Sequence, residues 1–179
     1  MGGSDAKMAE LILYVSDRCQ LDPAYGATKL NKILFYADFL YYAKHGESIT
    51  GQEYMRLDKG PAPRRLVPVR EEMVAAGELV VRPQAYGPWQ QKRPIALRDA
   101  DLGAFSGEEI AMIDSVIAAF WGKSATEVSA ISHRFEGWEY AKDRETIPYA
   151  TALTSEREPD EQDYAFAREL GREYAAARG

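Results

Sequence analysis

The chain has 179 residues, of which 46% are hydrophobic and 28% are charged, and its formal net charge is −6. This length and composition are typical of one globular domain with a sizeable core, and the acidic net charge argues against a dedicated nucleic-acid binder. The single cysteine, Cys19, excludes an intrachain disulfide and a cysteine-rich zinc site. We find no secretory signal and no apolar run that could span a membrane, and therefore expect a cytoplasmic protein without a membrane partner.

Apolar residues at helical spacing predict two helices near the start of the chain, over residues 5–18 and 28–44. The second helix carries apolar and aromatic side chains on several sides, so we expect it at the centre of the fold. Lys29, Lys32 and Asp38 lie beside its apolar positions, and we expect these three residues to pair with other elements. The predicted core stripe of the second helix consists of Leu30, Ile33, Leu34, Ala37 and Leu40.

The middle of the chain shows short strands around one helix. Residues 53–57 alternate polar and apolar side chains, as a short strand does, and residues 59–63 form a rigid loop rich in glycine and proline. A helix is predicted over residues 64–76. Residues 79–85 and 89–97 are predicted to be two strands joined by a turn, and we expect all three strands to form one small antiparallel sheet.

Two capping boxes mark the starts of helices in the second half of the chain. Ser106 with Glu109 opens a long helix, and Ser124 with Glu127 opens a shorter one, because each pair satisfies backbone N–H groups that have no partner in the first turn. Residues 133–143 are expected to continue as a helix or as a helix and a turn.

These elements predict an α+β fold, a mainly helical single domain with a small antiparallel β-sheet inserted between helical halves. The domain is expected to cover residues 5–155. Residues 156–179 are expected to form an acidic segment and a C-terminal helix, at 160–177, that pack on the domain or extend it. Residues 56–98 carry nine Lys or Arg and four Asp or Glu, whereas residues 143–163 carry two and seven. This uneven charge indicates electrostatic pairing, either with a partner or between the two segments.

Three blocks of the sequence resemble one known family. Residues 29–38, with the sequence KLNKILFYAD, resemble the signature helix of the Panacea, or SocA-like, antitoxin domain. The 49–51 turn, Tyr54 and the 59–63 loop are similar to the segment after that helix in the family, and residues 132–138 resemble its second signature. The family-signature residues, for which we expect structural roles, are Lys29, Leu30, Lys32, Asp38, Gly51, His133, Glu136 and Trp138.

The resemblance implies an antitoxin domain that occurs beside many unrelated toxins in bacteria and prophages and that neutralises the toxin by direct protein contact. One branch of the family is instead a proteolytic adaptor that delivers the toxin to a protease. The expected partner is therefore a cognate toxin, with a protease as a second partner in the adaptor alternative. No cofactor is implied, and the oligomeric state stays open.

His133 and Glu136 form the best candidate for chemistry, because residues three apart share a helical face and a general base needs an orienting partner. No nucleophile, phosphate-binding loop or metal-ligand spacing accompanies the pair. We therefore predict no catalytic residue and no metal site, and we expect that the chain is not an enzyme. An enzymatic module that uses this pair remains an alternative.

Four basic residues, Arg82, Lys92, Arg93 and Arg98, lie along the two longer predicted strands, with aromatic residues between them. Basic residues interleaved with aromatic ones can bind single-stranded nucleic acid. The acidic net charge favours a solvated sheet face instead, so a nucleic-acid partner is not expected.

Candidate residues for partner binding come from a loop and from aromatic positions. Gly60 and Pro61 predict a rigid platform beside a cleft, and Arg64 and Arg65 add a positive patch. Segment 156–163 is expected to be a solvated linker, a cover for a basic toxin surface, or the tether of an adaptor. Aromatic side chains supply much of the binding energy at protein interfaces, and the aromatic candidates are Tyr36, Tyr41, Tyr42, Tyr54, Tyr86 and Trp89.

Overall fold

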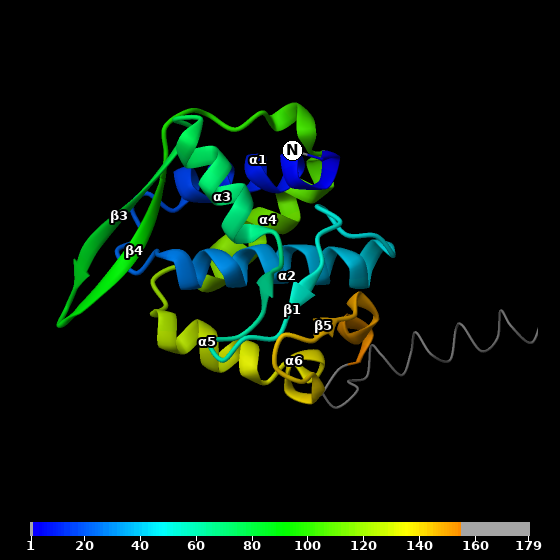
Figure 1. Cartoon of the computed structure of the whole chain (residues 1–179). Coiled ribbons are helices and arrows are strands. Elements are labelled where there is room, and N and C mark those ends of the chain that lie inside the picture. The colour runs from blue at the N-terminus through cyan, green and yellow to red at the C-terminus, as the bar shows by residue number, and fades with distance from the viewer. Residues whose placement is uncertain (1, 155–179) are drawn as a thin grey trace, which may run out of the picture.

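The structure, a computed structural model, describes residues 2–154, and of Trp89 it describes the backbone only (Figure 1). The predicted helix at 160–177 and the acidic segment 156–163 therefore lie outside the described residues. Within the described part the chain forms α1 (Gly3–Arg18), α2 (Ala27–His45), α3 (Leu66–Ala75), α4 (Gly107–Phe120), α5 (Ala125–His133) and α6 (Glu136–Tyr140), with short 3-10 helices η1 (Leu102–Ala104) and η2 (Tyr149–Leu153). The predicted mainly helical α+β class is confirmed.

Helix α2 crosses the middle of the molecule, with α1 and α3 on one side and α5 on the other (Figure 1). Its Ile33 and Leu34 are fully buried, as the sequence predicted. Leu40 is 43% exposed, so its place in the core stripe was wrong. At that turn of the helix Phe39 packs into the core instead, and the centre of its ring lies 4.6 Å from that of Tyr149 in η2.

The strands form two separate antiparallel sheets where the sequence predicted one. Strand β1 (Tyr54–Met55) lies between β2 (Ala62–Pro63) and β5 (Thr146–Ile147), while β3 (Leu79–Tyr86) pairs only with β4 (Trp89–Ala96). The prediction failed because β2 and β5 have two residues each, which is too short for any period-2 pattern to show.

The β3–β4 hairpin projects from the helical body (Figure 1), and a buried arginine in the middle of β4 holds it to the segment after α1. The guanidinium of Arg93 donates hydrogen bonds of 2.7 to 3.2 Å to four carbonyl oxygens after α1, those of Cys19, Gln20, Asp22 and Tyr25. The last carbonyl groups of a helix have no partner within the helix, and the planar guanidinium offers five donors at once. The expectation of a solvated face is therefore wrong for Arg93.

Replacing Arg93 by Met should lower the free energy of unfolding by about 3 kcal/mol, because several buried carbonyl groups would lose their only charged donor. Urea unfolding measures this change. Arg82→Met is the matched control, because Arg82 is exposed and lies opposite Arg93 in the hairpin register. Equal stability of the two variants would contradict the anchoring role of Arg93.

Both predicted capping boxes are present. The Ser106 hydroxyl accepts from the Glu109 N–H while the Glu109 carboxylate accepts from the Ser106 N–H, and Ser124 and Glu127 repeat the arrangement. These local signals located the starts of α4 and α5 correctly.

Candidate functional site

The first polar residue of the signature helix joins the two ends of a tight turn. The Lys29 ammonium lies 2.6 Å from the Asp22 carboxylate, and both side chains are almost fully buried. Asp22 also accepts a hydrogen bond from the Ala24 N–H at 2.9 Å. The ion pair therefore fixes the entry into α2, and removing either partner would leave a buried charge alone.

The Asp38 carboxylate accepts hydrogen bonds from residues of the segment that follows α2. It accepts from the N–H and hydroxyl of Thr50 and from the Tyr54 hydroxyl at 2.7 Å, with the Tyr149 hydroxyl at 3.5 Å. Burial raises the pKa of the Asp38 carboxyl, and the bonds from Thr50 and Tyr54 oppose that shift. This network ties α2 to β1 and η2.

The loop that begins at Leu57 passes directly over Lys32 of α2. Gly60 has φ +99, and a Cβ atom on it would overlap Ser132 Oγ and would lie 2.6 Å from Lys32 Nζ. Only glycine fits at this position, because other residues would clash there and would be strained at a positive φ. The loop thus reaches α2 and α5 together.

Replacing Gly60 by Ala should therefore lower the free energy of unfolding by about 3 kcal/mol, through backbone strain and overpacking against Lys32 and Ser132. Chemical denaturation tests this expectation. Gly107→Ala provides the control, since no heavy atom lies within 4 Å of an added Cβ there. A Gly60→Ala variant as stable as the control would show that the loop can move away freely.

The second signature supports the same loop from the other side. The His133 ring stacks on the Trp138 ring at 4.0 Å and 9°, and Trp138 Nε1 donates to the Leu57 carbonyl at 3.0 Å. The Arg56 guanidinium lies 4.4 Å from the centre of the Trp138 ring. The expected shared helical face of His133 and Glu136 is wrong, because α5 ends at His133 and α6 begins at Glu136.

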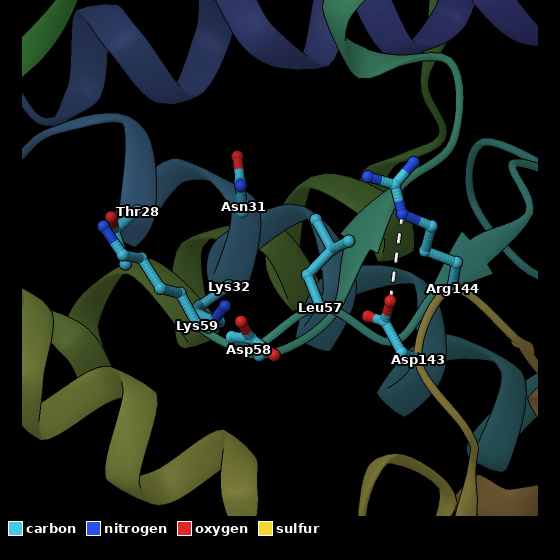
Figure 2. A pocket seen from close by; sticks show the side chains of 9 residues that line it. Thr28, Asn31, Lys32, Leu57, Asp58, Lys59, Asp143 and Arg144 are labelled. Atoms are coloured by element: carbon cyan, nitrogen blue, oxygen red, sulfur yellow. Dashed lines mark ion pairs between the residues drawn. The ribbon is translucent and has the colours of Figure 1, made fainter.

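A polar cavity of about 360 Å³ opens between the signature helix and this loop (Figure 2). Burial lowers the pKa of Lys32, which lines the cavity, to about 7. The Lys32 ammonium donates to the Pro61 carbonyl at 3.3 Å, and among the described residues no carboxylate lies within 4.0 Å of it. The lining residues are Thr28, Asn31, Lys32, Leu57, Asp58, Lys59, Gly60, Asp143 and Arg144.

The aromatic candidates for partner binding lie at different depths. Tyr41 and Tyr54 are buried in the core, whereas Tyr36, Tyr42 and Tyr86 are half-buried. Trp89 pairs with Tyr86 at the tip of the hairpin. The structure therefore brings the candidates to several places, and does not gather them into one patch.

The loop candidates are divided in the same way. Gly60 and Pro61 are buried, while Arg64 and Arg65 are exposed. Arg64 donates to the Arg144 carbonyl at 2.7 Å, and Arg65 pairs with Asp5 at 3.0 Å. Both arginines thus hold the chain together at the surface as well as contributing positive charge to it.

A second groove, of about 580 Å³, separates α3 from the hairpin and was not foreseen from the sequence. Its lining is mostly apolar in surface and consists of Arg70, Glu71, Val74, Ala75, Val81, Pro83 and Lys92. Val74 is 44% exposed. Helix α3 buries one apolar side through Leu66, Val69 and Met73. The additional apolar residues Val67 and Val74 were the sequence signal that part of α3 is exposed.

Sequence reasoning also missed Asn31, Lys59 and Arg144 as lining residues of the polar cavity. Lys32, beside the apolar stripe of the signature helix, was the available signal for the cavity, since lysine is rarely buried without a partner. No described helix is long and apolar enough to cross a membrane. Over residues 2–154 no three His, Cys, Asp or Glu side chains are grouped to hold a metal ion.

In a comparison with protein families, the model for "Antitoxin SocA-like, Panacea domain" matches residues 30–139. The match begins in α2 and ends in α6, and so includes the polar cavity loop, α3 and the hairpin. Comparisons with curated proteins and with solved structures found no significant match.

Proposed function

This chain belongs to the SocA-like antitoxin family that carries the Panacea domain, and on that basis we propose that it neutralises a cognate toxin by binding it directly. Family membership favours a binding role over catalysis, and the separation of His133 from Glu136 by a helix break supports the same choice. The proposal places the complex in the cytoplasm.

The observation that carries the proposal is the groove between α3 and the β3–β4 hairpin, which lies within the matched region. The apolar side chains of Val74, Val81 and Pro83 lie in the groove, and the charged side chains of Arg70 and Lys92 also line it. An apolar centre with a polar rim is the usual anatomy of a protein–protein interface. We therefore propose that a surface segment of the toxin inserts here.

Of the residues proposed from the sequence, Tyr86 and Trp89 pair at the tip of the same hairpin and remain proposed contacts, and Arg65 precedes α3 directly. Tyr42 and Arg64 remain proposed contacts outside the lining of the groove. The buried Tyr41, Tyr54, Gly60 and Pro61 would act by holding the fold, while half-buried Tyr36 donates to the Ile131 carbonyl at 3.4 Å.

Co-expression with the neighbouring gene tests the proposal. The neighbour should stop growth when expressed alone, and this chain should restore growth and co-purify with it. Val74→Glu places a charge in the groove and should weaken the complex about 30-fold, which abolishes rescue at low expression. Val67→Glu is the matched control, since Val67 is 51% exposed on the same helix but does not line the groove.

Three outcomes would contradict direct neutralisation through this groove. If the product of the neighbouring gene does not stop growth, it is not a toxin that this chain could neutralise. Rescue without a complex, accompanied by loss of the toxin only in cells that contain their proteases, would favour the adaptor alternative. Equal behaviour of the Val74→Glu and Val67→Glu variants would leave the toxin contact on another surface and reject the groove.

A further inference from the structure

Lys32 is a buried cation without a buried counter-ion. It is 1% exposed, and its one hydrogen bond within the described residues goes to the Pro61 carbonyl at 3.3 Å. An ammonium has three donors, so this bond leaves most of its hydrogen-bonding capacity unused. Burial of an unpaired charge is strongly unfavourable, and a methionine of similar length would fill the position at no such cost.

The other buried polar residues of α2 show the contrast. Lys29 has the Asp22 carboxylate at 2.6 Å, and Asp38 has the Thr50 and Tyr54 donors. Lys32, on the same helix, has only a backbone carbonyl among the residues that the structure describes. Residues that lower stability without a structural return are typical of functional sites.

The space beside Lys32 is a built cavity. The loop above it is fixed by Gly60, which fits only without a side chain, and by the hydrogen bond from Trp138 to the Leu57 carbonyl. Asn31 lines the same cavity, and its side-chain oxygen is buried without a hydrogen-bond partner in the described part of the chain. A ligand donor could satisfy this oxygen.

The charges around the cavity favour an anion. Lys59 and Arg144 join Lys32 in its lining, against Asp58 and Asp143. Asp143 Oδ2 lies 3.9 Å from Arg144 Nε, and both of these side chains are more than 60% exposed (Figure 2). The deepest charge in the cavity is thus the positive charge of Lys32, and the acidic groups lie toward solvent.

We propose that this cavity binds an anionic group, a carboxylate or a phosphate, whose oxygen is the counter-ion of Lys32 and whose neighbouring N–H or O–H group meets Asn31. A volume of about 360 Å³ suits a small molecule or one or two inserted side chains. The anion has two possible sources, a free small molecule or an acidic side chain of the protein partner. The second source rests on the proposed toxin binding.

A titration of the full chain tests the free-molecule source. Sodium phosphate and sodium citrate are added at pH 7, with sodium chloride at matched ionic strength as reference. We expect a saturable rise in Tm of about 5 °C for the wild type, because a ligand that binds only the folded state stabilises it. Lys32→Met should abolish the rise. Lys44→Met, on the exposed end of α2, should retain it.

The partner source gives a different pattern. In that case phosphate and citrate have no effect beyond chloride, but Lys32→Met weakens toxin binding at least about tenfold while Lys44→Met leaves it unchanged. Equal Tm responses of wild type and Lys32→Met, together with unchanged toxin affinity, would overturn the proposal. If the neighbouring gene encodes no toxin, the proposed function fails, and the anion titration alone then decides whether the cavity is an anion site.

Discussion

Replacing Lys32 by Met should raise the free energy of unfolding by about 4 kcal/mol at pH 7, after allowance for the lost hydrogen bond to Pro61. Burial lowers the folded-state pKa of Lys32 to about 7, whereas lysine in an unfolded chain titrates near its ordinary value of 10.5. At pH 7 and below, folding must therefore work against the burial of a charged ammonium.

The pH dependence gives this prediction its sharpest form. Between pH 7 and 10.5 the unfolded chain binds a proton that the folded chain has released, so wild-type stability contributed by this group rises with pH. The advantage of Lys32→Met is greatest below about pH 7 and disappears near pH 10.5. Asp58, Lys59, Asp143 and Arg144 also line the cavity, but they are present in both proteins and cancel in the comparison.

Urea unfolding of both proteins at about pH 6.5, 8.5 and 10 measures the effect. A stability difference that does not change with pH would show that Lys32 does not titrate in this range. A Lys32→Met variant that is less stable than the wild type at pH 7 would show that the ammonium is compensated within the fold, and would weaken the argument for an external counter-ion.

Replacing Asp38 by Ala should have an effect of similar size in the opposite direction, a loss of about 4 kcal/mol. The substitution removes the acceptor of the Thr50 N–H, the Thr50 hydroxyl and the Tyr54 hydroxyl, all of them buried. It also leaves a cavity at a fully buried position of α2. The Tyr54→Phe variant, which removes one donor only, should lose much less.

Asp99→Ala is the matched control for this prediction, because Asp99 is exposed and its carboxylate has no hydrogen bond in the described structure. The two alanine variants are compared by urea unfolding at pH 7. An Asp38→Ala variant within about 1 kcal/mol of the control would mean that the donors find other acceptors, and that the Asp38 network does not hold β1 and η2 to α2.

Local signals in the sequence predicted the helical frame. The apolar pattern of α2 and the capping boxes of α4 and α5 involve residues within a few positions of each other. Such short-range patterns can be recognised without knowledge of the tertiary structure. The hairpin was also predicted, because its strands have eight residues each. Its separation from β1 was not, since pairing between distant two-residue strands leaves no periodic pattern.

The candidate site was predictable only as a set of residue types. The family resemblance singled out Lys32, the 59–63 loop and Trp138, but the contacts that fix the loop over Lys32 join positions about 30 to 80 residues apart. The burial of Arg93 was equally hidden, because its four acceptors are backbone carbonyl groups, which every sequence contains. Long-range polar partners, unlike helix caps, have no fixed spacing.

The central claim is direct neutralisation, and calorimetric titration of the purified chain into the purified product of the neighbouring gene tests it most directly. The account predicts a complex of fixed stoichiometry with a Kd of about 1 µM or tighter, and loss of toxin activity in proportion to the complex formed. Val74→Glu should weaken the complex and Val67→Glu should not. A toxin that is neutralised in cells but shows no heat of binding and full activity in the mixture would contradict the account.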